Sequence, residues 1–145
     1  MGVIQCRGDN MKIYFAASVR GGRGDVEIYA RIIKLLKAHG EVITEYLGDK
    51  KLSNQGEIKL DDKEVYERDV ELLRSADVFV AEVTTPSLGV GYEIACAEKL
   101  NKRVLCLFRE ILGKRLSNMI SGNKNLTVKI YKEVKDIPEI LKDFL

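Results

Sequence analysis

The sequence predicts an α/β protein with a flavodoxin-like (Rossmann-like) three-layer sandwich, in which a five-stranded parallel sheet of order 2-1-3-4-5 carries helices on both faces. Short apolar runs rich in β-branched residues alternate with segments of helical periodicity along the 145-residue chain. No long repeat and no linker-like segment divides it. We therefore expect a flexible lead-in at residues 1–11 and one domain over residues 12–145.

The first half of the chain predicts two strands and two helices. The first helix has the i, i+3, i+4, i+7 stripe of a helix packed on a sheet, formed by Tyr29, Ile32, Ile33 and Leu36. Asp61 or Asp62 caps the second helix. The long polar stretch at 47–61 is expected to pass over the active face, as a lid would. Strands are predicted at 12–17 and 42–46, and helices at about 26–38 and 62–75.

The second half of the chain continues the alternation of strands and helices. The strand at 78–83 is broken only by Glu82. Pro138 is acceptable in the first turn of the last helix. Further strands are predicted at 103–108 and 128–131, and helices at about 93–100, 112–120 and 137–145.

The stretch after the third predicted strand is the most informative part of the sequence. In this strand order the loops that leave the first and third strands lie side by side, and ligands bind there. Gly89 and Gly91 are expected to bracket a tight turn, with Glu93 in the first turn of the following helix. The positive end of the helix dipole should keep this carboxylate ionised. Glu93 is therefore a candidate nucleophile, although acidic residues are common in first turns for structural reasons alone.

Asp69 is the second unusual carboxylate. It falls on the apolar stripe of the predicted helix at 62–75, flanked by Tyr66, where an ionised side chain is costly unless it is paired or functional. A salt bridge or a loop cap is the structural alternative. Two carboxylates that converge from different elements suit cleavage of a glycosidic bond, in which one stabilises the sugar cation and the other handles protons.

The loop after the first strand favours an anion site. It offers Ser18, Arg20 and glycines such as Gly21, and arginine holds phosphate through two parallel hydrogen bonds. The loop matches neither the GxxxxGK[ST] nor the GxGxxG pattern, so ATP and NAD are poorly supported. A glycine turn with an exposed arginine is the alternative. With Ser87 expected nearby, we favour a small monophosphate ester. Tyr14 either packs in the core or hydrogen-bonds the nucleophile.

Composition excludes several classes of function. A net charge of +2 without a basic run argues against nucleic-acid binding. There is no membrane-length apolar stretch and no signal peptide, so a cytoplasmic or nuclear protein is expected. Three cysteines without a CxxC pair and a single histidine argue against zinc and against a Cys-His catalytic pair.

Four segments together resemble the 2'-deoxynucleoside 5'-monophosphate N-glycosidase (Rcl) family of the nucleoside 2-deoxyribosyltransferase superfamily. They are IYFAASVRGG, ERDVELLRSADVFVAEVTTPSLGVGYEI, KRVLCLF and RLSNMI. The resemblance covers nearly all of the chain from residue 12 onward. It implies an enzyme that hydrolyses deoxynucleoside monophosphates to free base and 2-deoxyribose 5-phosphate. It also implies a homodimer without metal or organic cofactor.

The resemblance also assigns roles to residues. Glu93 looks like the nucleophile, Asp69 like the second catalytic carboxylate and Tyr14 like their supporting tyrosine. Tyr46 departs from the family pattern, because the mammalian members have a histidine at this site-lining position. Three alternatives stay open: a nucleoside deoxyribosyltransferase, a cytidine or hydroxymethylcytidine monophosphate N-glycosidase, and a non-catalytic nucleotide-binding module. The residues that resemble the 5'-phosphate site are Ser18, Arg20, Gly21, Ser87, Gly89, Gly91 and, from the neighbouring subunit, Ser117.

Overall fold

The fold is a parallel sheet of five strands in the order β2-β1-β3-β4-β5, which confirms the predicted topology. A computed structural model describes residues 11–19, 25–44 and 60–145. Residues 1–10, most of the predicted lid at 47–61 and the segment 20–24 lie outside the described residues. The strands in chain order are β1 (Lys12–Ala16), β2 (Glu41–Val42), β3 (Val78–Glu82), β4 (Arg103–Arg109) and β5 (Thr127–Tyr131).

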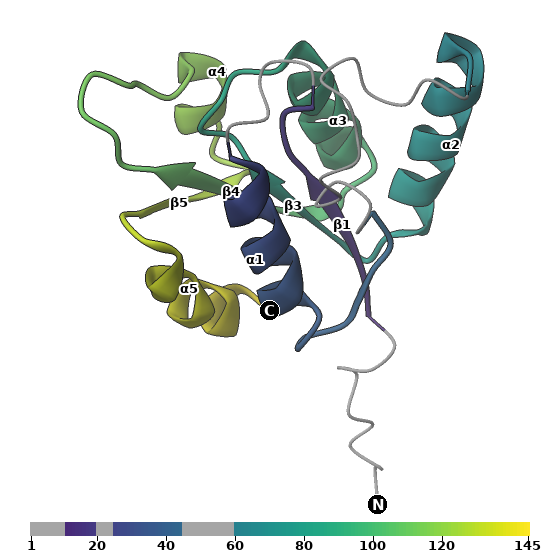
Figure 1. Ribbon diagram of the computed structural model, residues 1–145. Coiled ribbons are helices and arrows are strands. Elements are labelled where there is room, and N and C mark those ends of the chain that lie inside the picture. Colours follow the sequence, from purple (N-terminus) through teal and green to yellow (C-terminus); the bar gives the residue numbers. More distant parts are fainter. Residues whose placement is uncertain (1–10, 20–24, 45–59) are drawn as a thin grey trace, which may run out of the picture.

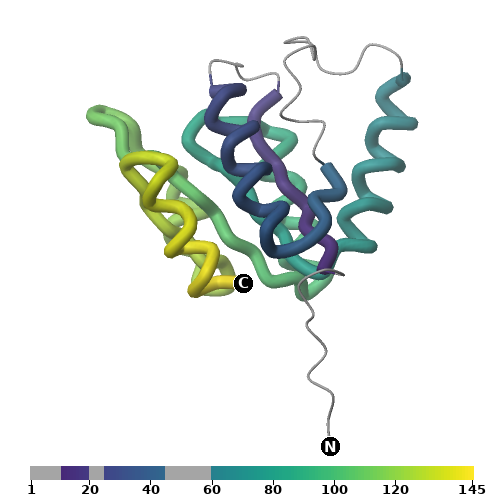
Figure 2. The backbone as a smooth tube through the Cα atoms, turned by 60° about the horizontal axis from the view of Figure 1, so that its bottom comes forward, coloured from purple at the N-terminus to yellow at the C-terminus, as the bar shows by residue number. Residues whose placement is uncertain are grey.

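Helices cover both faces of this sheet, because alternate strand residues point to opposite sides. Figures 1 and 2 show α1 and α5 on one face and α2 and α3 on the other. Ile13 and Phe15 of β1 pack in the α1/α5 core, whereas Tyr14 and Ala16 pack in the α2/α3 core. The helices are α1 (Val26–Leu36), α2 (Asp62–Ser75), α3 (Leu88–Lys99), α4 (Asn118–Ser121), the 3-10 turn η3 (Val134–Asp136) and α5 (Ile137–Phe144).

The start of each site-bearing helix is set by a polar cap. The Asp61 carboxylate accepts a hydrogen bond from the Glu64 N–H, and the Glu64 carboxylate accepts one from the Asp61 N–H, which forms a capping box. α2 has the bounds predicted for it. Ser87 caps α3 by accepting from the Val90 N–H. Gly89 and Gly91 therefore lie inside α3, and the prediction that they bracket a turn is wrong. The serine cap starts the helix before them.

Two other predicted elements are shorter than expected. β2 ends at Val42, where the hydroxyl of Thr44 takes over the pairing: it accepts from the Phe15 N–H (2.8 Å) and donates to the Phe15 carbonyl (2.6 Å). The predicted helix at 112–120 reduces to α4, and Leu112 is fully exposed. A side chain with no apolar surface to pack on cannot hold a helix in place.

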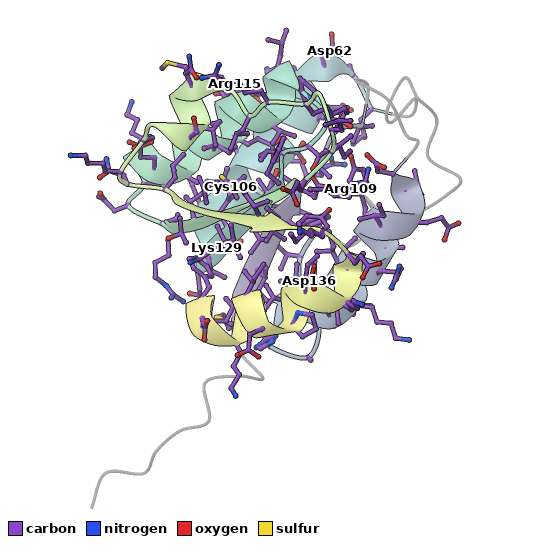
Figure 3. The ribbon with its side chains drawn as sticks, turned by 90° about the vertical axis from the view of Figure 1, so that its left-hand side faces the viewer. Asp62, Cys106, Arg109, Arg115, Lys129 and Asp136 are labelled. Atoms are coloured by element: carbon purple, nitrogen blue, oxygen red, sulfur yellow. The ribbon has the colours of Figure 1, made fainter. Side chains whose placement is uncertain are left out.

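No helix of the described ranges is long and apolar enough to span a membrane. The described residues also include no cluster of three or more histidine, cysteine or acidic side chains that could hold a metal. Cys106 lies in β4 (Figure 3), where burial raises the pKa of its thiol to about 12. Cys96 is half-buried in α3, and both thiols are free.

Candidate active site

The centre of the site is a hydrogen bond between β1 and α3. The hydroxyl of Tyr14 donates to Oε2 of Glu93 at 2.5 Å. Tyr14 itself is buried and stacks on Phe79 of β3, with ring centroids 5.3 Å apart. Because β1 and the exit of β3 meet at the switch point of the sheet, two residues 79 positions apart in the chain come into contact. Of the two possibilities for Tyr14, packing and hydrogen bonding, both are realised.

The carboxyl of Glu93 has a pKa well above the ordinary value. The pKa of its carboxyl is raised from 4.5 to about 7: burial raises it most, the Tyr14 hydrogen bond lowers it, and the negative charge of Asp69 raises it. The raised pKa differs from the effect that was expected of the helix dipole, which would favour the ionised form. Glu93 is the sixth residue of α3, so it lies beyond the first turn in which the helix dipole acts. Desolvation therefore dominates over the dipole.

Asp69 lies in α2, and its charge acts on Glu93. Its side chain is about a quarter exposed and pairs with Arg68, whose Nη2 lies 2.8 Å from Oδ1. Its charge is nevertheless felt by Glu93, which places the two carboxylates in electrostatic contact. The salt-bridge interpretation of Asp69 is confirmed, and its convergence with Glu93 on one site stays a prediction. Tyr66, expected beside the buried stripe, is instead 53% exposed and faces the ring of Tyr92.

The start of α3 opens onto a cavity of about 520 Å³. Ser87, Gly91 and Ser117 line it together with Met119 of α4. A Cβ at Gly91 would meet no atom within 4 Å, and one at Gly89 would meet only the Ser87 hydroxyl at 3.8 Å. The fold therefore does not need these glycines for packing, although each weakens the helix. Without side chains at Gly89 and Gly91, the backbone at the start of α3 is accessible to a ligand.

The other predicted site residues divide into two groups. Ser18 follows β1, is fully buried, and its hydroxyl has no hydrogen-bond partner among the described residues. Ser117 caps α4 by accepting from the Met119 N–H, and lines the same cavity as Ser87 of its own chain. Arg20, Gly21 and Tyr46 lie outside the described residues.

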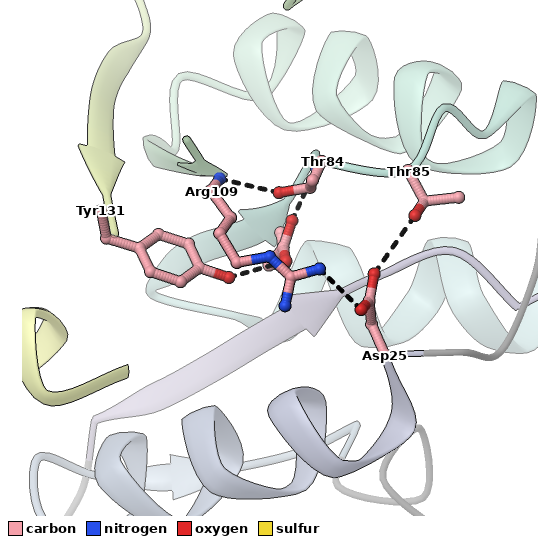
Figure 4. Close-up of polar contacts among 6 residues, drawn as sticks. Asp25, Thr84, Thr85, Arg109 and Tyr131 are labelled. Carbon is pink, nitrogen blue, oxygen red and sulfur yellow. Dashed lines mark hydrogen bonds and ion pairs between the residues drawn. The ribbon is translucent and has the colours of Figure 1, made fainter. Parts of the chain in front are cut away.

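A second polar cluster, on the α1/α5 face, was not among the predicted site residues. Glu82 is fully buried, accepts hydrogen bonds from the Thr84 N–H (2.6 Å) and the Tyr131 hydroxyl (2.9 Å), and burial raises its pKa. Arg109, at the end of β4, pairs with Asp25 at 2.7 Å (Figure 4). The signal in the sequence was Glu82 itself, a charged residue inside an apolar strand.

Fold and site together define an α/β protein that brings a half-buried acidic group and its tyrosine partner together beside the switch point of a parallel sheet. Residues 13–128 match the family described as nucleoside 2-deoxyribosyltransferase. The chain belongs to this family.

Relatives with assigned names extend the comparison. A Danio rerio protein named 5-hydroxymethyl-dUMP N-hydrolase is 50% identical over 137 residues, which span 92% of this chain and 95% of the relative. A Tetraodon nigroviridis protein of the same name is 46% identical over 138 residues, 92% of this chain and 96% of the relative. The solved structure of Clostridium botulinum CMP N-glycosidase, BcmB, matches with a TM-score of 0.66 at 18% identity over 92% of this chain and 99% of that one, and shares the fold.

Proposed function

We propose that this protein hydrolyses the N-glycosidic bond of 2'-deoxynucleoside 5'-monophosphates, releasing the free base and 2-deoxyribose 5-phosphate. The observation that carries the proposal is Glu93, a half-buried carboxyl with a pKa of about 7 that is oriented by Tyr14 and lies within the field of Asp69. Such a group is poised to react at neutral pH. Relatives that share half of the sequence and are named N-hydrolases support the same chemistry.

In the proposed reaction the ionised form of Glu93 attacks C1' of the deoxyribose. The bond between C1' and the base nitrogen breaks, its electron pair leaves with the base, and the base takes up a proton. Water then attacks C1' of the glycosyl ester, the bond between C1' and Glu93 breaks, and the proton that water loses balances the one taken up by the base. The products are the sugar phosphate and the restored carboxylate. Tyr14 orients the attacking oxygen. Asp69 handles protons or anchors a sugar hydroxyl.

The 5'-phosphate is assigned to the loops after β1 and β3. The bare backbone at Gly89 and Gly91 and the Ser87 cap support an anion at the start of α3. The buried and unpartnered hydroxyl of Ser18 supplies a donor from β1, as far as the described residues show. Arg20 and Gly21 complete the proposed site, and Tyr46 lines the sugar or base.

The proposal includes a homodimer in which Ser117 reaches the phosphate of the neighbouring subunit. Leu88 and Met119 line the Ser87 cavity and are 97% and 80% exposed, and apolar side chains exposed together favour a protein interface. A second copy seated there would remove them from water. Sedimentation of the intact chain tests this part of the proposal.

The decisive experiment is a panel of ribo- and deoxynucleoside 5'-monophosphates, scored by chromatography for liberated base. We expect base release from deoxynucleotides, slower reaction of nucleosides without phosphate, and loss of turnover in Glu93→Gln. Glu71→Gln, which removes an exposed carboxylate from α2, is the matched control. Unchanged turnover in Glu93→Gln would eliminate Glu93 as nucleophile.

The family name favours a nucleoside deoxyribosyltransferase as the second candidate, in which a base replaces water as acceptor. Adding a free acceptor base to the same assay separates the two reactions. Formation of a new nucleotide at the expense of the sugar phosphate identifies a transferase. Binding of a monophosphate without base release by either route identifies a non-catalytic module.

A further inference from the structure

The cluster on the α1/α5 face fastens the loop that leads from β3 to α3. The backbone N–H of Arg109 donates to the Thr84 hydroxyl at 2.8 Å, and the Thr84 N–H donates to Glu82. The Thr85 hydroxyl donates to Oδ2 of Asp25 at 3.3 Å (Figure 4). Two successive residues of the loop are therefore tied to α1 and β4. Ser87, the cap of α3, follows Thr85 by two positions.

Asp25 is used in an unusual way for its position. It stands directly before α1, where aspartate normally accepts a hydrogen bond from the first helical N–H groups. Its carboxylate makes no such cap. Instead Oδ1 accepts from Nη2 of Arg109 at 2.7 Å, and Oδ2 accepts from Thr85. Both oxygens are thus committed to tertiary contacts with β4 and with the β3–α3 loop.

The ion pair is well shielded from solvent. The side chains of Arg109 and Asp25 are 21% and 18% exposed, and the buried Nε of Arg109 has no hydrogen-bond partner within the described ranges. A partly buried pair that leaves one donor unsatisfied is a poor device for stability alone. Its geometry is better explained by what it holds in place. The ion pair holds Thr85 in place, together with the segment that continues to Ser87.

We propose that Asp25 and Arg109 are positioning residues that act through Thr85 to hold Ser87 and the start of α3 where the 5'-phosphate of the substrate binds. The inference rests on the proposed function, since it assigns the tethered loop to the phosphate. Tyr131 of this cluster packs in the α1/α5 core and Tyr14 packs in the α2/α3 core, so we assign Asp25 and Arg109 no contact with the reacting atoms. Loss of the tether should therefore weaken phosphate binding and leave the chemical step nearly intact.

The test compares Thr85→Val with Thr85→Ser on 5-hydroxymethyl-dUMP and on the same nucleoside without phosphate. Valine keeps the shape and loses the hydroxyl, whereas serine keeps the bond to Asp25. For Thr85→Val and Asp25→Asn we expect KM for the monophosphate to rise about tenfold with kcat within about twofold, and no change on the nucleoside. Thr85→Ser should behave as the parent.

Arg103→Gln is the control for a merely structural role. This arginine lies at the opposite end of β4, where its guanidinium donates to the Phe144 carbonyl, so its loss should lower Tm without changing KM. Equal KM values for parent, Thr85→Val and Asp25→Asn on the monophosphate would overturn the inference, as would an equal rise on the nucleoside.

Failure of the proposed function is a separate outcome. If the parent releases no base from any monophosphate, the Kd of 5-hydroxymethyl-dUMP, measured by calorimetry, replaces KM. A Kd about tenfold weaker in Thr85→Val than in the parent supports the positioning role. An equal Kd, or no binding by the parent, overturns it.

Discussion

Removing the hydroxyl of Tyr14 should shift the titration of Glu93 upward. Hydrogen bonds to charged groups contribute about 1.5–3 kcal/mol, and each pKa unit corresponds to about 1.4 kcal/mol. Tyr14→Phe should therefore raise the pKa of Glu93 from about 7 to about 8–9. At pH 7 the ionised fraction would fall from about one half to about 1–10%, which corresponds to a loss of about 5- to 50-fold in rate. The Phe79 stacking is retained.

The assay is the pH dependence of kcat/KM together with a carboxyl NMR titration of Glu93. Tyr14→Phe should move the acidic limb to higher pH and regain rate in alkaline buffer. Asp69→Asn removes a negative charge beside Glu93 and should move the Glu93 titration to lower pH. An acidic limb that stays near pH 7 in Tyr14→Phe, or equal directions of shift in the two variants, would refute the reasoning.

Three further predictions concern stability. The pKa of Glu93 is about 7 in the folded chain and 4.5 in the unfolded chain, so the free energy of unfolding falls as pH rises between these values. In urea titrations Glu93→Gln should therefore be about 3 kcal/mol more stable than the parent at pH 8 and equal to it below pH 4.5. A stability difference that does not depend on pH contradicts this prediction. Gly91→Ala should raise the free energy of unfolding by about 0.5–1 kcal/mol and raise KM for the monophosphate. Gly113→Ala, at φ +81°, should only lower the stability. An unchanged KM in Gly91→Ala argues against a ligand at the start of α3. Thr44→Val leaves the N–H and C=O of Phe15 unpaired and should cost about 2–4 kcal/mol, while Thr44→Ser keeps most of it; equal unfolding midpoints would contradict the pairing.

Elements whose caps and apolar stripe lie within one segment were predicted correctly from the sequence. α2 has the predicted bounds because a capping box and an apolar stripe act within one segment. α4 is much shorter than predicted, because the apolar residue Leu112 finds no surface to pack on. β2 stops early because a side chain, Thr44, replaces the backbone as the partner of Phe15, and no propensity encodes that exchange.

The sequence by itself determined the class of fold and the strand order. Each rests on periodicity and on the order of elements along the chain, which are properties of neighbouring residues. Only the tertiary structure decided that Glu93 titrates near neutrality, that Tyr14 holds it, and that Asp25 turns away from its own helix to Arg109. Those outcomes depend on solvent exclusion and on charges brought together across the sheet, and neither exists before the chain has folded.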